Sequence, residues 1–260
     1  IEAAGPRALV LVETELWPNL IAAAVARGVP VALMSARISD RSLDRYLRFA
    51  RGLMREAVRS LSVVGAQTEA DRQRFIRLGA DPARVHVTGN LKFDLPVDPQ
   101  AVSEGARLRA RWAAGRPMWM AGSTHPGEEE LLLEAQRRVL AAARGRNAPA
   151  PLLVMAPRRP ERFDAVARWL AGQGVRHARL SAADDAPADA EVLLVDAMGV
   201  LPRWYAAADF AFVGGSLAPV GGHNLLEPAA LGRAVLCGPH TFNAPDVTRL
   251  LAEAGGARVV

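Results

Sequence analysis

Short apolar runs alternate with amphipathic helical patterns along the chain, and this rhythm limits the fold more than any other feature. Runs typical of β-strands lie at residues 8–12, 29–34, 61–66 and 85–88, with helical patterns such as 42–54 and 69–78 between them. A second series has strand-like runs at 118–122, 152–156, 192–195, 209–213 and 235–237, and helices near 127–143, 161–171 and 244–254. Such alternation predicts parallel sheets covered on both faces.

A stretch with two prolines separates the two series. Residues 93–100 contain Pro96 and Pro99 and interrupt the alternation, as a linker would. We therefore expect an α/β protein of two Rossmann-like, doubly wound domains that face a cleft, at residues 1–96 and 97–260, the first of them incomplete. Ligands of such sheets bind beyond the carboxyl ends of the strands, so the loops after each strand are the places to look for a site.

Composition and charge exclude several classes of protein. With 260 residues and 50% hydrophobic content the chain can bury a sizeable core, and its single cysteine rules out an internal disulfide. The five histidines have no paired metal-ligand spacing, so we expect neither a metal nor a cofactor. A net charge of +5 favours an anionic partner such as a membrane surface or a phosphorylated substrate. Dispersed arginines and 5% aromatic content disfavour nucleic acid.

The most informative loop is residues 212–228, FVGGSLAPVGGHNLLEP. Its glycines let the backbone approach a ligand, and unpaired N–H groups where the next helix starts favour a phosphate. Asn224 and Glu227 lie three residues apart and can face one site, where a carboxylate accepts hydrogen bonds from ribose hydroxyls. The alternative is a capped helix, with Asn224 as N-cap and Glu227 as its N3 partner. The pattern alone leaves both interpretations open.

Polar residues also follow two other strands of the second series. Ser123 and Thr124 come after residues 118–122, where a hydroxyl can cap the next helix or the N–H groups can bind a phosphate oxygen. Pro157 and Arg158 come after residues 152–156, where a guanidinium group can bind phosphate or carboxylate in a bidentate manner. The alternative for such an arginine is a solvated position on the surface.

Two carboxylates directly follow the first strand. Desolvation of Glu13 and Glu15 is unfavourable unless they are paired, so they are candidates for function, although acids also favour a helix N-terminus. Because Thr14 separates them, we expect Glu15 to face the site and Glu13 to be held by local hydrogen bonds. Lys92, where the first domain ends, either points toward an anionic ligand or is solvated.

Taken together, these segments resemble the 3-deoxy-D-manno-octulosonic acid (Kdo) transferases of lipopolysaccharide synthesis, which have the GT-B fold. The matching words are ETELWPN (13–19), SARIS (35–39), GNLKFD (89–94), GSTHPGEE (122–129), PRRPERF (157–163) and GGSLAPVGGHNLLEPAALG (214–232), followed by GPHTFN (238–243). They occur in the family's order and cover nearly the whole chain. A set of this kind is specific where no single word would be.

The resemblance implies inverting, metal-independent transfer of Kdo from CMP-Kdo to a lipid A precursor (lipid IVA) at the cytoplasmic face of the bacterial inner membrane. It implies that Glu15 and Lys92 stabilise the transition state. It also implies that CMP contacts the positions Pro157, Arg158, Met198, Gly199, Val200, Asn224, Leu225, Leu226 and Glu227. Ser123, Thr124, His125 and His223 are further candidates for contact with the donor and its phosphate.

This chain departs from the family's usual pattern at two positions, Val200 in place of glutamate and Arg159 in place of histidine. The family's general base lies in a segment upstream of Ile1, so the chain is expected to be a piece that lacks this base and the N-terminal membrane anchor. Two alternatives stay open: another GT-B enzyme that uses a UDP-sugar, either a transferase or an epimerase, or a nucleotide-binding fragment without catalysis.

Overall fold

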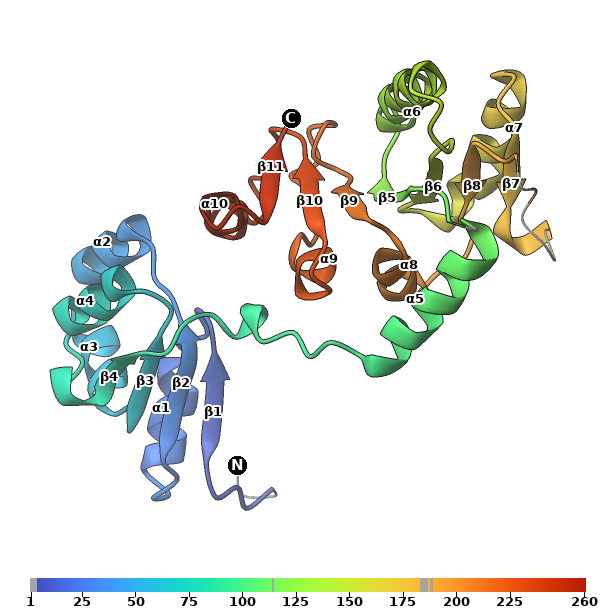
Figure 1. Ribbon diagram of the computed structural model, residues 1–260. Helices are drawn as coiled ribbons and strands as arrows, with labels where there is room; N and C mark the ends of the chain where they lie inside the picture. Colours follow the sequence, from blue (N-terminus) through green and yellow to red (C-terminus); the bar gives the residue numbers. More distant parts are fainter. Residues whose placement is uncertain (1–3, 114, 183–186, 188) are drawn as a thin grey trace. The chain divides into compact units, whose positions relative to one another are not determined.

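The computed structural model describes residues 4–113, 115–182, 187 and 189–260 (Figure 1). The chain divides into two compact units, Ile1–Asp94 and Leu95–Val260, and the division falls two residues before the expected boundary. Each unit is built of helices around an all-parallel sheet, so the predicted α/β class with two Rossmann-like units is confirmed. Within the described residues, no helix combines the length and the apolar character needed to cross a membrane.

The first unit has a four-stranded sheet with the order β1-β2-β3-β4. Its elements are β1 (Leu9–Val12), α1 (Pro18–Val25), β2 (Val31–Ala36), α2 (Asp40–Phe49), α3 (Arg51–Arg59), β3 (Val63–Ala66), α4 (Glu69–Leu78), β4 (Val85–Val87) and the 3-10 turns η1 (Pro82–Arg84) and η2 (Leu91–Phe93). The single helix predicted at 42–54 is wrong, because Ala50 adopts a non-helical conformation (φ −140°, ψ 25°) and separates α2 from α3.

The strand order of the first unit places its helices on one face of the sheet. When four parallel strands follow one another in sequence order, every right-handed crossover passes over the same side. The core lies on that side and includes Leu11, Leu33 and Phe75. On the opposite side of β1, Val10 and Val12 are 57% and 44% exposed. Alternation of strands and helices indicates crossovers but not strand order, so it does not distinguish this one-sided cover from cover on both faces.

The second unit has a seven-stranded parallel sheet with the order β11-β10-β9-β5-β6-β8-β7. Its elements are α5 (Pro99–Trp112), β5 (Met118–Thr124), α6 (Glu128–Gly145), β6 (Leu152–Pro157), α7 (Phe163–Gly172), β7 (His177–Arg179), β8 (Val192–Leu194), α8 (Leu201–Ala207), β9 (Phe210–Val213), α9 (Leu226–Ala230), β10 (Ala234–Cys237), α10 (Pro245–Glu253), β11 (Ala257–Val259) and the 3-10 turns η3 (Pro160–Arg162) and η4 (Leu180–Ala182). The chain winds outward from β5 in both directions, which makes β5 and β9 the switch point of the sheet.

Helices cover both faces of this second sheet (Figure 1). One core cluster joins α6 and α7 to the sheet through residues such as Leu133 and Leu170. Another joins α5 and α8 to the opposite face through Trp112 and Trp204. The linker predicted at residues 93–100 ends earlier than expected, because the Asp98 side chain caps α5 and a proline takes its first position.

Gly122 in β5 is required by packing. A Cβ atom at this position would lie 2.1 Å from the hydroxyl oxygen and 2.7 Å from the ring carbon Cζ of Tyr205 in α8. Tyr205 is itself buried, so its ring has no room to withdraw. The close approach of α8 to the middle of the sheet therefore depends on the absence of a side chain at residue 122.

Candidate functional site

The loops after β5, β6, β8 and β9 lie at one edge of the second sheet, because all its strands are parallel. The first two of these loops are joined by backbone contacts. Thr124 pairs with Pro157 at the end of the ladder, and the Arg158 N–H donates to the Thr124 carbonyl at 3.0 Å. The polar residues that the sequence places after β5 and β6 are therefore neighbours in space.

His125 and His223 form a direct pair between the loops after β5 and β9. Their Nε2 atoms are 2.8 Å apart, and the rings stack with centroids 5.0 Å apart and planes 13° from parallel. Both side chains are half-buried. They lie over Gly215, where a Cβ atom would come within 3.1 Å of the His223 Nε2 and where φ is +70°. A glycine at residue 215 is therefore needed for the turn and for the histidine pair.

A buried carboxylate, that of Glu128, organises the loop after β9. Its Oε1 accepts hydrogen bonds from the N–H groups of Ser216 at 3.0 Å and Leu217 at 2.9 Å. Its Oε2 accepts from the N–H groups of Gly215 at 2.8 Å and His125 at 2.9 Å. Glu128 is the first residue of α6 and is fully buried, so the protein's own negative charge fills the concave ring of N–H groups that the glycine loop forms.

The sequence predicts a phosphate at the unpaired N–H groups where the helix after this loop starts. The N–H groups earlier in the loop, those of residues 215–217, are not available to it, because Glu128 accepts hydrogen bonds from all three. The start of α6 likewise carries carboxylates at Glu128, Glu129 and Glu130, which already offset the positive end of the helix dipole. An anionic ligand beside residues 215–217 and the start of α6 therefore depends on side chains for positive charge.

The loop after β5 also differs from its predicted role as a helix cap. Gly127 occupies the N-cap position of α6 without a side-chain hydrogen bond. The Thr124 hydroxyl instead donates to Glu129 at 2.7 Å, and Glu129 forms a two-point ion pair with Arg162, with N···O distances of 2.7 and 3.1 Å. Ser123 is buried and adopts a left-handed conformation (φ +57°). Neither hydroxyl caps α6.

A cavity of about 430 Å³ opens beside His125 and is lined by His125, Pro126, Arg159, Glu161 and Arg162. Arg162 is paired with the buried Glu129. Arg159 is exposed, and its ion pair with the exposed Glu161 is long, with an N···O distance of 3.7 Å. Arg158 is also exposed, and the part of the chain that the structure describes offers no hydrogen-bond or ion-pair partner for its guanidinium group. Arg158 therefore remains available for an anionic ligand.

Asn224 and Glu227 lie together at the start of α9. The Asn224 amide donates to Glu227 at 3.3 Å, and its Oδ1 accepts from the Leu226 N–H at 3.0 Å. The second contact is an Asx-type turn just before α9. The N-cap position of α9 is Leu225, without a side-chain hydrogen bond, so the alternative with Asn224 as N-cap is wrong. The long first contact leaves the half-buried carboxylate free to accept other donors. Burial, assisted by the nearby charge of Glu227, raises the pKa of Tyr205 above its ordinary value.

The other predicted donor contacts divide into exposed and buried side chains. Met198 is exposed and Gly199 takes a left-handed turn (φ +73°), both in the loop after β8. Val200 packs into the core beneath α8, and Leu225 and Leu226 pack into the core beneath α9. These three buried residues can offer a ligand only their backbone, so a valine in place of the family's glutamate at residue 200 is compatible with the packing of this chain.

In the first unit, Lys92 pairs with Glu13 at an N···O distance of 2.6 Å. Lys92 had been expected to reach an anionic ligand or to be solvated, and Glu13 had been expected to be held by local hydrogen bonds. The carboxylate of Glu15 instead accepts a hydrogen bond from the indole N–H of Trp17, and both side chains are exposed. No local pattern indicates the Glu13–Lys92 pair, since its members lie in segments far apart along the chain.

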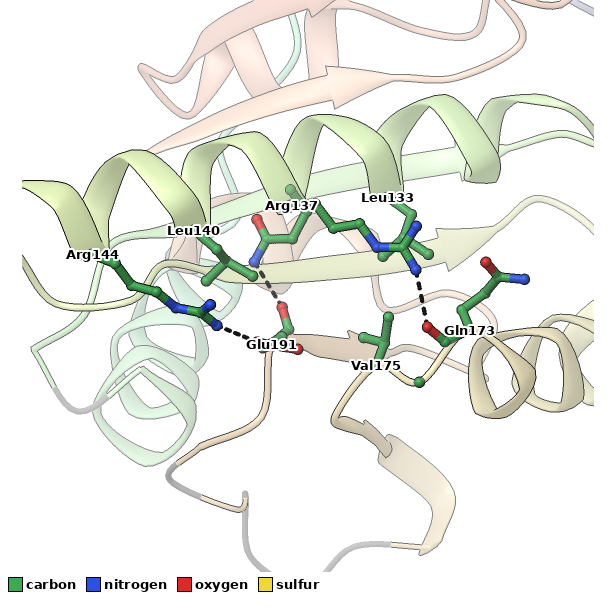
Figure 2. A pocket seen from close by; sticks show the side chains of 9 residues that line it. Leu133, Arg137, Leu140, Arg144, Gln173, Val175 and Glu191 are labelled. Carbon is green, nitrogen blue, oxygen red and sulfur yellow. Dashed lines mark hydrogen bonds and ion pairs between the residues drawn. The ribbon is translucent and has the colours of Figure 1, made fainter.

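Another hollow, of about 170 Å³, lies between α6 and the segments that lead into β7 and β8, at the opposite edge of the sheet (Figure 2). Its polar groups satisfy one another: Arg137 donates to the Gln173 carbonyl at 3.0 Å, and Arg144 contacts the Glu191 carboxylate at 3.4 Å. The buried Gln136 donates to the Glu191 carbonyl at 2.9 Å. Because these polar groups already form hydrogen bonds and ion pairs with one another, few donors and acceptors remain for a ligand. Across the described residues, no three His, Cys, Asp or Glu side chains gather as a metal ion would require.

Comparison with known families and structures agrees with the motifs. A family profile described as 3-deoxy-D-manno-octulosonic-acid transferase (kdotransferase) matches residues 1–95. Among solved structures, the C-terminal CMP-Kdo binding domain of WaaA from Acinetobacter baumannii is 32% identical with a TM-score of 0.57, and the match covers 63% of this chain and 83% of that domain. The chain belongs to the Kdo transferase family.

Curated members of the family match nearly the whole chain. The 3-deoxy-D-manno-octulosonic acid transferase of Bordetella pertussis is 44% identical over 97% of this chain, and that of Haemophilus influenzae is 38% identical over 96%. The chain spans only 58% and 57% of the lengths of these relatives. The UDP-GlcNAc 2-epimerase of Methanocaldococcus jannaschii, 13% identical with a TM-score of 0.55 over 98% of this chain and 66% of its own, shares the fold alone.

Proposed function

We propose that this chain supplies the donor-binding part of a glycosyltransferase that transfers Kdo from CMP-Kdo to a lipid A precursor. The observation that carries the proposal is the match to a structure described as a CMP-Kdo binding domain, at 32% identity over 83% of that domain. The predicted donor residues of the second unit follow β5, β6, β8 and β9, at the edge where parallel sheets bind ligands. Fold, family and placement agree.

In the donor site that we propose, different residues contact different parts of the nucleotide. Glu227, whose carboxylate is half-buried and held loosely by Asn224, accepts hydrogen bonds from the ribose hydroxyls. Arg158 meets the negative charge of the phosphate, because its guanidinium is exposed beside the loop after β5. Met198 and Gly199 contact the nucleotide through a loop that protrudes after β8. Preorganised charge of this kind stabilises a departing CMP better than it stabilises the bound donor.

We further propose that Glu15 and Lys92 act on the sugar rather than on the nucleotide. Both follow strands of the first unit, and the Glu13–Lys92 pair fixes the lysine at a defined position. The reaction we propose inverts the anomeric carbon without a metal or cofactor, at the cytoplasmic face of the inner membrane. The net charge of +5 supports attraction to an anionic membrane surface, and the dispersed arginines argue against a nucleic-acid partner.

Calorimetric titration of the 260-residue chain with CMP and with UMP tests the donor assignment. The proposal predicts a dissociation constant about 5- to 150-fold lower for CMP. A site that hydrogen-bonds the cytosine amino group leaves its own acceptor unpaired opposite uracil, which costs about 1 to 3 kcal/mol. Equal affinity for the two nucleotides would contradict the CMP-Kdo assignment and favour a donor of the UDP-sugar class.

A further inference from the structure

The structure leaves the phosphate of the proposed donor with an unusual set of partners. In many nucleotide sites, backbone N–H groups of a glycine loop or helix start bind the phosphate. Here the Glu128 carboxylate already accepts hydrogen bonds from the N–H groups of Gly215, Ser216 and Leu217, at N···O distances of 2.8 to 3.0 Å. A phosphate at this position would face a buried carboxylate instead of free donors, so side chains must supply its hydrogen bonds.

The His125–His223 pair is placed to supply them. An Nε2···Nε2 distance of 2.8 Å requires one ring to donate and the other to accept, because two N–H donors would repel each other at this separation. At least one of the two nitrogens is therefore without a proton in this structure. The ring of His125 also lines the 430 Å³ cavity beside Arg159 and Arg162, so an anion that enters the cavity reaches the His125 member of the pair.

The charged groups around the pair come from three segments. Glu128 and Glu129 lie at the start of α6, Arg158 and Arg159 follow β6, and Arg162 precedes α7. Glu129 is paired with Arg162 and Arg159 with Glu161, whereas Glu128 accepts hydrogen bonds from neutral N–H groups and keeps its charge. Among the described residues around the pair, Arg158 is the cation without an ion-pair partner. Burial chiefly lowers the pKa of both histidines, and for His223 the neighbouring His125 and Arg158 lower it further.

We infer that His125 and His223 form a protonatable phosphate-binding pair, which takes up a proton from solvent when the phosphate of a cytidine nucleotide binds beside it. In the free protein the two rings share one N–H between their Nε2 atoms. A bound phosphate accepts a hydrogen bond from one ring, and its negative charge favours protonation of the ring nitrogen that had been the acceptor. The pair then separates into two donors, both directed at phosphate oxygens. This inference rests on the proposed donor site.

Proton uptake makes nucleotide affinity depend on pH with a defined sign. The bound phosphate raises the histidine pKa values, which burial lowers in the free protein. Protons are therefore taken up at pH values between the pKa of the free protein and that of the complex. As pH falls through this interval, the affinity for the nucleotide rises. Where a whole proton is taken up, the dissociation constant for CMP decreases about tenfold for each unit that pH falls. Cytidine has no phosphate, so its affinity stays constant over the same interval.

The test is calorimetric titration of CMP into the 260-residue chain at about pH 7, in buffers with different ionisation enthalpies. The slope of the observed enthalpy against buffer enthalpy counts the protons exchanged, and we expect uptake of about 0.5 to 1 proton per CMP. The double variant His125→Gln/His223→Gln keeps polar side chains without the titration, and its uptake should fall close to zero with at least tenfold weaker CMP binding. His177→Gln, in a half-buried histidine of β7 away from this edge, is the matched control and should behave as wild type.

The wild-type measurement alone can overturn the inference, so it does not depend on the folding of any variant. CMP binding without proton uptake, or uptake that persists in the double variant, would show that the pair is not the phosphate partner while the donor site stands. Cytidine binding with the same uptake would also contradict it. Failure of the wild-type chain to bind CMP at all would overturn the proposed donor site and this inference with it.

Discussion

The substitution Glu128→Gln tests the claim that a buried carboxylate shapes the loop after β9. The change keeps the size of the side chain but replaces one acceptor oxygen with an NH2 donor. In the wild-type protein, Oε1 of Glu128 accepts hydrogen bonds from the backbone N–H groups of Ser216, Leu217 and, at 3.3 Å, Ala218. Oε2 accepts hydrogen bonds from the backbone N–H groups of His125 and Gly215. Either orientation of the glutamine amide therefore turns a donor toward at least two backbone N–H groups.

The magnitude follows from those two unpaired donors. A buried N–H group without an acceptor costs about 1 to 3 kcal/mol, so two of them predict a loss of about 2 to 6 kcal/mol in the free energy of unfolding. This is a large share of the roughly 5 to 15 kcal/mol that stabilises an ordinary domain. Amides of the loop after β9 should also exchange with solvent faster in the variant, because their carboxylate acceptor is gone.

Urea denaturation followed by tryptophan fluorescence measures the loss. Four of the five tryptophans lie in the second unit, namely Trp112, Trp119, Trp169 and Trp204, so the signal reports mainly on that unit. Glu130→Gln is the matched control, since Glu130 is an exposed acid in the same turn of α6 and its loss should change stability by less than about 0.5 kcal/mol. A loss below about 1 kcal/mol for Glu128→Gln, with unchanged amide exchange, would refute the reasoning.

Two further substitutions test Glu227 and Asp196: the first separates nucleotide binding from folding stability, and the second tests how stability depends on pH. Glu227→Ala should weaken CMP binding by about 1.5 to 3 kcal/mol, the range for a charged hydrogen-bond partner, whereas a purely capping role predicts about 1 kcal/mol of lost stability and unchanged affinity. The side chain of Asp196 is buried, and although burial alone would raise its pKa, hydrogen bonds from Ser181 and Arg179 hold that pKa below its ordinary value. Its ionised form therefore contributes stability above about pH 4 that is lost as pH falls further, so Asp196→Asn should destabilise more at about pH 7 than at about pH 3 in urea denaturation.

Local signals in the sequence were sufficient where the determinants lie within one element. The helix predicted at residues 69–78 has those bounds in the structure, because the Thr68 hydroxyl caps its start and Gly79 ends it in a left-handed conformation (φ +119°). At the break at Ala50 the nearest glycine is Gly52, which lies inside α3, so no glycine or proline marks the position where the helix is interrupted. The break depends on how the two flanking helices pack against the sheet.

Contacts between distant segments account for the rest of the site. Glu128 lies in the first turn of a helix, where an acid is common. Its position in the sequence does not indicate that it accepts hydrogen bonds from N–H groups 87 to 89 residues away. The His125–His223 contact joins residues 98 positions apart for the same reason. The motifs predict that the histidines contact a ligand, whereas the contacts among these residues depend on the topology of the sheet.

The contact between Gly122 and Tyr205 has a consequence for how substitutions in this family should co-occur. Gly122 begins the GSTHPGEE segment, yet its lack of a side chain accommodates the tyrosine of α8 rather than a ligand. A Cβ atom at residue 122 would lie 2.1 Å from the Tyr205 hydroxyl oxygen, so an alanine there becomes tolerable only when the residue at 205 is smaller. The two positions should therefore vary as a compensating pair among related sequences, and a change at either one alone should be selected against even where donor binding is intact.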